Sequence, residues 1–252
     1  MSGHSKWNNI KNTKAKMDAI KGKVFTKIGR EIAVAVKEGG ADPNTNSKLY
    51  DIVQKAKQAN MPNDNIQRSI KKASGELSGV NYADMLYEGY GSNGVAFVVE
   101  CLTDNKNRTA GDVRHAFDKC GGALGTSGSV MFMFDRKGVV VFEKSTFENV
   151  DEALDFALEF SMENPDAEID DIVDDGDVYV LSCSSGAYHK VITEFEKFLK
   201  AKGKNVAIVE SGVQYVPNNY VELSEENKAK IDRLVDMLED LDDVQNVYHN
   251  AL

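Results

Sequence analysis

The sequence predicts an α+β protein in which an N-terminal helical bundle precedes two ferredoxin-like α+β domains, the third domain being inserted within the second. Apolar residues recur with the 3.6-residue period of a helix up to about residue 75. After that they gather in short runs rich in β-branched and aromatic residues. The expected elements after residue 81 then repeat one strand and helix order twice. A chain of 252 residues is also long enough that more than one core is expected.

Three helices are expected in the first 76 residues. The first ends at Gly39-Gly40, the second spans about 47–59 and closes before Pro62, and Asp64 with Gln67 is the expected capping box of the third. Their apolar positions at helical spacing are Phe25, Ile28, Ile32 and Val36, then Leu49, Ile52, Val53 and Ala56, then Ile66, Ile70 and Ala73. Stripes of this kind predict a small helical bundle.

Short strands and amphipathic helices alternate in the rest of the chain. Strands are expected at 95–101, 130–134, 139–142, 178–183, 206–209, 212–216 and 244–248, and helices at 107–119, 149–162, 187–202 and 225–241. Residues 138–209 form one complete split βαβ unit, and a second copy is divided around it. The expected domains are therefore 1–76, then 77–134 together with 211–252, and 135–210 as the inserted acidic domain.

Charge is distributed unevenly along the chain. The formal net charge is −10, yet residues 1–76 hold 15 Lys and Arg against 7 Asp and Glu, a net of +8, which leaves 15 against 33, or −18, for the remainder. Such an asymmetry indicates contact with a polyanion through one end of the molecule. A solvated charged surface is the alternative that charge alone does not exclude.

The nucleic-acid-binding residues follow from this asymmetry. Lysine and arginine side chains of the N-terminal region are expected to contact phosphates, whereas Trp7 either stacks on a base or packs on the bundle, packing being the commoner fate of a large aromatic. The expected set is Lys6, Trp7, Lys11, Lys14, Lys16, Lys21, Lys23, Lys27, Arg30, Lys55, Lys57, Arg68, Lys71 and Lys72.

Several segments resemble chemical motifs without meeting their requirements. Residues 89–94 spell GYGSNG, but this GxGxxG precedes a strand instead of opening a helix, so a turn between strands is expected. Residues 121–129 (GGALGTSGS) lack the lysine of a P-loop, which leaves a helix-to-strand connection or a backbone anion nest. The acidic run 170–177 fails the EF-hand spacing because Val173 occupies a ligand position, so a solvated turn is expected.

No catalytic, cofactor or metal site is expected. Cys101, Cys120 and Cys183 are far apart and lack CxxC spacing, so buried reduced thiols are the interpretation, and the four histidines are equally scattered. The chain has neither a secretory signal nor an apolar run long enough to span a bilayer. A cytoplasmic location without membrane contact is therefore expected.

Six segments carry a family resemblance over essentially the whole chain. They are GHSKW at 3–7, KVFTK at 23–27, GGADPNTN at 39–46, ANMP at 59–62, YEGYG at 87–91 and GGALGTSGSV at 121–130. The chain resembles the YebC family in these segments. That resemblance implies three domains, the third inserted in the second, and a regulator without catalytic residues. The first 20 residues depart from the family pattern at Asn9, Asn12, Thr13 and Asp18, which bears on affinity more than on identity.

Two roles follow from the resemblance, and both use nucleic acid. Members are commonly described as probable transcriptional regulators that bind DNA, while others, including a mitochondrial relative, act as translation factors on the ribosome. The expected function is a non-enzymatic, monomeric regulator of gene expression that binds rRNA or tRNA within the ribosome, or else DNA. RNA is favoured because no helix carries several base-reading side chains. The alternative is a protein-protein scaffold that uses its acidic α+β domains.

Overall fold

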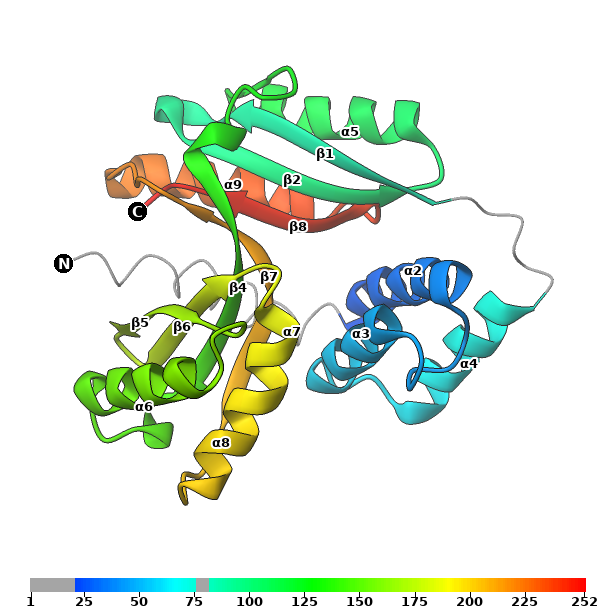
Figure 1. The fold of residues 1–252 in the computed structure, drawn as a ribbon. Helices are drawn as coiled ribbons and strands as arrows, with labels where there is room; N and C mark the ends of the chain where they lie inside the picture. Colours follow the sequence, from blue (N-terminus) through cyan, green and yellow to red (C-terminus); the bar gives the residue numbers. More distant parts are fainter. Residues whose placement is uncertain (1–20, 76–81) are drawn as a thin grey trace. The chain divides into compact units, whose positions relative to one another are not determined.

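The computed structural model describes residues 21–75 and 82–252, in which helices accompany two separate antiparallel sheets (Figure 1). The predicted α+β class is confirmed. Residues 134–218 form one compact unit, and the described residues of 21–133 form another with 219–252. The predicted boundary between residues 76 and 77 lies outside the described residues.

The N-terminal helical region contains the three helices that the periodicity predicts. They are α2 (Lys21–Gly39), α3 (Ser47–Gln58) and α4 (Asn63–Ser74). Their apolar stripes form one core that includes the fully buried Ile32 and Leu49 together with Ile66. Burial of these faces, more than intrinsic helix propensity, stabilises three helices this short.

Asn46 joins the first two of these helices. Its side-chain oxygen accepts a hydrogen bond from the Leu49 amide at 3.0 Å, which caps α3, and its amide nitrogen donates to the Ala35 carbonyl of α2 at 2.7 Å. Gly40 ends α2 with φ of +87°, a conformation that glycine adopts without strain. The predicted capping box of α4 is wrong, because the helix begins at Asn63, which places Asp64 in its first turn, and the N-cap residue is Pro62, which makes no side-chain cap.

Sheet A has the strand order β3-β1-β2-β8. Its strands are β1 (Ala83–Tyr90), β2 (Ala96–Thr103), β3 (Ala123–Leu124) and β8 (Val244–His249). Two helices, α5 (Lys106–Lys119) and α9 (Glu225–Glu239), share a core with one face of the sheet. Phe97 and Phe117 meet edge to face there, with ring centroids 5.7 Å apart.

Sheet B has the order β5-β6-β4-β7, which is the strand order of a ferredoxin-like unit. Its strands are β4 (Phe134–Glu143), β5 (Ile169–Asp175), β6 (Val178–Ser184) and β7 (Ile208–Pro217). The helices packed on it are α6 (Val150–Glu163), α7 (Tyr188–Lys190) and α8 (Glu196–Ala201), the last two joined by a π-helical turn at Val191–Phe195. In chain order, all four strands lie between β3 and β8 of sheet A.

Two predicted strands are wrong in place or partner. Residues 130–134 were expected to be a strand of the split domain, but Met131–Met133 is a 3-10 turn and the second strand of that unit is β3. Residues 212–216 were assigned to the same domain, but they belong to β7, which pairs with β4 along its length. In place of residues 212–216, the remaining strand of the split unit is β1, which precedes β2, β3 and β8 in the chain. The first part of β4 is not predicted as a strand, because the charged residues Asp135, Arg136 and Lys137 resemble a linker between domains.

The glycine-rich motifs have structural roles. Residues 89–94 lead from β1 through a 3-10 turn, Ser92–Gly94, into β2, so the predicted turn between strands is confirmed. The loop that follows β3 forms a nest for an anion that the protein itself supplies. Glu88 accepts backbone hydrogen bonds from Gly128 at 2.6 Å, Val130 at 2.8 Å and Met131 at 2.9 Å. Burial alone would raise the pKa of Glu88, but these three donors hold it below its ordinary value.

The acidic run is a strand and a turn, not a turn alone. Asp170 and Asp174 lie on β5; Asp170 pairs with Lys137 of β4, and Asp174 pairs with Lys144 in the 3-10 turn that follows β4. None of the helices in the described part of the chain is both long and apolar enough to cross a bilayer.

Candidate nucleic-acid interface

The outer face of α4 presents three cations close together. Arg68, Lys71 and Lys72 follow one another at i, i+3 and i+4 and are exposed, while Ile66 and Ile70 on the opposite side enter the helical core. None of the three forms an ion pair with a residue that the structure describes. Their charges are therefore not neutralised by any carboxylate that the structure describes, and the two lysines in the last turn interact favourably with the helix dipole.

The last turn of α3 adds two further cations with different surroundings. Lys57 is exposed and forms no ion pair with the residues described in the structure. Lys55 pairs with Glu31 of α2 at 2.7 Å, so its charge is partly neutralised within the helical region. Among the described residues, Lys57 therefore has no carboxylate partner, whereas Lys55 has one.

The cations of α2 contact the C-terminal end of α9. Lys23 pairs with the Asp240 carboxylate at 3.0 Å, and Lys27 donates to the Glu239 carbonyl at 2.9 Å. Free carbonyls at the C-terminus of a helix carry partial negative charge and attract cations. Burial lowers the pKa of Lys27, because desolvation disfavours its charged form. This face of α2 is accordingly occupied by the protein's own acceptors.

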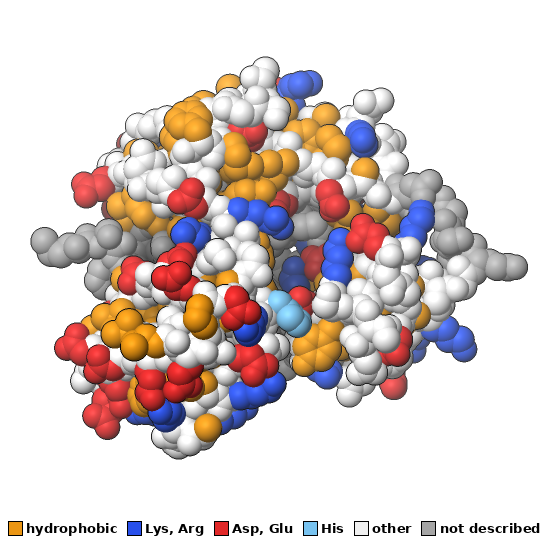
Figure 2. Space-filling view, in the orientation of Figure 1, with side chains coloured by type: hydrophobic (Ala, Val, Ile, Leu, Met, Phe, Trp, Pro, Cys, Tyr) orange, Lys and Arg blue, Asp and Glu red, His pale blue; other side chains and the backbone are white. Residues whose placement is uncertain are grey.

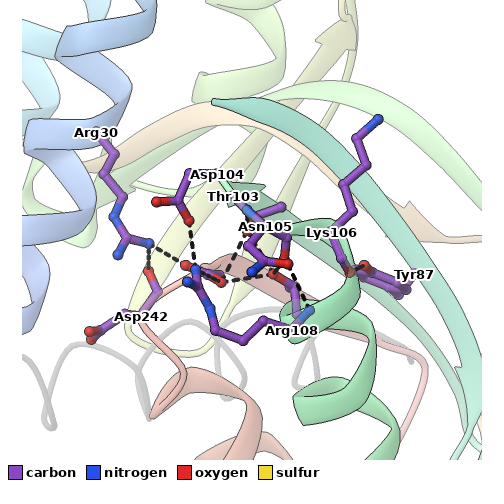
Figure 3. A network of polar contacts seen from close by, with 10 residues as sticks. Arg30, Tyr87, Thr103, Asp104, Asn105, Lys106, Arg108 and Asp242 are labelled. Carbon is purple, nitrogen blue, oxygen red and sulfur yellow. Dashed lines mark hydrogen bonds and ion pairs between the residues drawn. The ribbon is translucent and has the colours of Figure 1, made fainter. Parts of the chain in front are cut away.

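Arg30 contacts two consecutive residues beyond the end of α9 (Figure 3). Its guanidinium donates to the Asp242 carbonyl at 2.6 Å and to the Asp243 carboxylate at 2.7 Å, and it lies 5.9 Å from the centre of the Tyr82 ring. The Arg30 side chain is 18% exposed and that of Asp243 is 8% exposed. Because both side chains are largely shielded from water, the attraction between their charges is screened less than in an exposed pair that involves a surface lysine.

Asp243 is the centre of a wider network in sheet A. Its second carboxylate oxygen accepts from Arg108 at 2.7 Å, from Thr109 at 2.7 Å and from Thr103 at 3.1 Å. Burial alone would raise the pKa of Asp243, but hydrogen bonds from Arg108, Thr109, Arg30 and Thr103 outweigh that effect and hold it below its ordinary value. The middle of α2, the end of β2 and the first turn of α5 therefore meet at one carboxylate.

Comparison with known protein families finds matches for both the helical region and the α+β part of the chain. Two family models match the chain, one described as the TACO1/YebC protein N-terminal domain over residues 5–76 and the other as the TACO1/YebC second and third domain over residues 82–251. The chain belongs to the TACO1/YebC family. The predicted family resemblance is confirmed.

Relatives of this TACO1/YebC chain match over nearly their whole length. A probable transcriptional regulatory protein of Acetivibrio thermocellus is 51% identical over 99% of this chain and 98% of its own. One from Clostridium acetobutylicum is 51% identical over 100% and 97%. The crystal structure of a conserved hypothetical protein from Aquifex aeolicus covers 94% of this chain and 93% of its own at 38% identity, with a TM-score of 0.77.

The structure divides the binding residues predicted for this family member. Those that contact the protein's own acceptors are Lys23, Lys27, Arg30 and Lys55. Those that are exposed without an ion pair among the described residues are Lys57, Arg68, Lys71 and Lys72. Lys21 begins α2, and the predictions for Lys6, Trp7, Lys11, Lys14 and Lys16 lie outside the described residues.

The thiols of this TACO1/YebC chain are free. Cys101 and Cys183 are buried and Cys120 is half-buried, so the predicted burial holds for two of the three. Burial raises the pKa of Cys101 to about 12 and that of Cys183 to about 11, which keeps both protonated at neutral pH. A protonated thiol is neither a metal ligand nor a nucleophile.

The sequence did not reveal the Asp243 network, and the nest expected as one alternative for residues 121–129 did not identify Glu88 as the anion that fills it. One local signal existed, since Asp104 and Arg108 stand at i and i+4 and do pair at 2.8 Å. The partner that matters, Asp243, lies 135 residues further along the chain. No spacing rule connects residues so far apart.

Proposed function

We propose that this TACO1/YebC member is a non-enzymatic regulator of gene expression that binds nucleic acid through the outer surface of its N-terminal helices. The observation that carries the proposal is the set of cations on α3 and α4, which are exposed and unpaired among the described residues. They are Lys57, Arg68, Lys71 and Lys72. The relatives are named probable transcriptional regulatory proteins, which supports a role in gene expression.

Charge contrast supports the same assignment. Residues 21–75 carry 11 Lys and Arg against 5 Asp and Glu, a net of +6, whereas residues 134–218 carry 8 against 18, a net of −10. A polyanion is attracted to the first region and repelled by the second. This contrast orients the protein on its ligand and limits contact to the helical region.

We favour RNA, in or near the ribosome, over duplex DNA. The exposed cations of α3 and α4 outnumber the exposed amides of α4, Asn63 and Gln67, so phosphate-binding side chains predominate over those that could read base edges in a major groove. Recognition through backbone and shape is typical of proteins that bind structured RNA. We also propose that the protein acts in the cytoplasm as a monomer without membrane contact.

Salt dependence tests the proposed surface. In the full chain, Arg68→Gln with Lys72→Gln should weaken RNA binding and reduce the slope of log K against log salt by about 1.4 on single strands, or about 1.8 on duplex DNA, if each side chain neutralises one phosphate. Lys197→Gln with Lys200→Gln is the matched control, because it removes the same charge from α8. An unchanged slope in the first variant, or an equal change in the control, would overturn the proposal.

Ribosome co-sedimentation separates translation from transcription. Pelleting with ribosomal subunits, and release by Lys14→Glu with Lys16→Glu, would support action on the ribosome. A promoter-specific gel shift that survives competitor RNA would instead support transcriptional control. Binding that persists after nuclease treatment would favour the alternative of a protein-protein scaffold.

A further inference from the structure

Helix α6 exposes an apolar row on the outside of the acidic unit. Leu154, Leu158 and Met162 stand at i, i+4 and i+8 and are 40%, 63% and 75% exposed. The buried face of the same helix is a different one, formed by Ala153, Ala157 and Phe160. The helix therefore has two apolar faces, of which sheet B uses only one.

Acidic side chains accompany this row. The fourteen residues of α6 include five carboxylates and no Lys, Arg or His. Glu152 pairs with Lys204 and Glu159 with Lys202. Asp151, Asp155 and Glu163 are exposed and form no ion pair with any described residue. Figure 2 shows red acidic and orange apolar side chains interspersed over the region where Figure 1 draws α6.

The geometry points to a docking site for a cationic amphipathic helix of a partner protein. The partner's apolar side chains would pack along Leu154, Leu158 and Met162, as in helix-to-helix recognition through i and i+4 anchors. Its lysines or arginines would face Asp155 and Glu163. Exposed apolar surface that is rimmed by polar residues marks interaction surfaces.

Charge decides against the other occupants. A nucleic acid or an anionic membrane would be repelled by the three carboxylates of this helix that form no ion pair with a described residue. A second copy of the chain would bring two such helices together, with like charges facing each other across an apolar contact. Only a cationic partner gains from both the apolar row and the acidic flank. This surface is separate from the one proposed for nucleic acid and does not depend on it.

Peptide binding to the full chain tests this site. The probe is a fluorescent helical peptide of about the length of α6, with leucines on one face and lysines on the others, and binding is read by anisotropy. Leu158→Asn with Met162→Gln should weaken binding about tenfold or more, since buried apolar anchors dominate such contacts. Asp155→Asn with Glu163→Gln should weaken it several-fold and reduce its salt dependence.

Two controls make the result decisive. Phe132→Gln changes another exposed apolar side chain, 73% exposed on a different segment, and should leave binding unchanged. A peptide with lysines and alanines but no leucine face should bind at least about tenfold more weakly than the amphipathic peptide. Circular dichroism verifies that the variants, all at exposed positions, remain folded.

Several outcomes would overturn the inference. Equal binding of the wild type and the Leu158→Asn, Met162→Gln variant would show that the apolar row takes no part. Equal binding of both peptides would reduce the contact to charge alone. A wild-type dimer in sedimentation equilibrium that this variant converts to monomer would make a second copy the occupant. Failure of the amphipathic peptide to bind would also count against the site.

Discussion

Replacement of Asp243 by Asn is the most informative perturbation of the described structure. The substitution preserves the size of the side chain but removes its charge and turns one acceptor into a donor. Arg30 would lose its anion, and the hydroxyls of Thr103 and Thr109 would lose an acceptor. All of these groups lie at the junction of α2, β2 and α5.

The expected cost follows from burial. Removing one partner of a buried ion pair costs about 3–5 kcal/mol, and the value here should be somewhat lower, about 2–4 kcal/mol, because Arg30 retains its bond to the Asp242 carbonyl. Arg108 adds little to this loss, since its side chain is 46% exposed and water can replace the carboxylate. Asp240→Asn is the matched control, because its pair with Lys23 is exposed on both sides and should contribute less than about 1 kcal/mol.

Native-state hydrogen exchange is the appropriate assay, because a chain with several cores need not unfold in one step. In Asp243→Asn, peptides spanning β2 and β8 should lose protection roughly 30- to 700-fold, the equivalent of the free energy above at about 1.4 kcal/mol per factor of ten. Asp240→Asn should stay within about fivefold of the wild type. Equal protection in the two variants would refute the reasoning.

The same network predicts a dependence on pH. Because the folded protein holds the pKa of Asp243 below its ordinary value, the carboxylate stabilises the fold at pH values above about 3.9, the pKa of an unfolded Asp. That contribution is lost as the pH falls from about 3.9 through the lowered folded value. The difference in protection between the wild type and Asp243→Asn should therefore be constant near neutrality and shrink below about pH 4.

Three further predictions concern sheet A. Glu88→Gln should weaken the nest by about 1–3 kcal/mol, because an amide has one acceptor oxygen for three backbone donors, and faster exchange of the Gly128 amide would report it. Gly122→Ala should destabilise the protein by about 1–3 kcal/mol, read from native-state hydrogen exchange of β1 and β3, since a Cβ there would lie 2.6 Å from the Tyr90 carbonyl oxygen. Gly111→Ala, inside α5 with no atom within 4 Å of the added Cβ, should instead stabilise it by about 0.5–1 kcal/mol; the same sign for both alanines would contradict the packing argument.

Local patterns determined much of this protein. The apolar stripes around Ile32, Leu49 and Ile70 were sufficient to predict α2, α3 and α4, because amphipathic periodicity acts within one helix. The runs at β2, β4 and β6 likewise predicted strands, and segments of the whole chain carried the family resemblance. The uneven distribution of charge is also a property of the sequence alone.

Tertiary structure decided the pairing of strands and the fate of the cations. The sequence cannot show that residues 212–216 pair with β4, because register depends on partners far apart in the chain. The sequence also cannot show that Arg30 pairs with Asp243 whereas Arg68 faces solvent, since both arginines occupy polar positions of a helix. A charge acquires its role from the group it meets in space, and that group lies 213 residues away from Arg30.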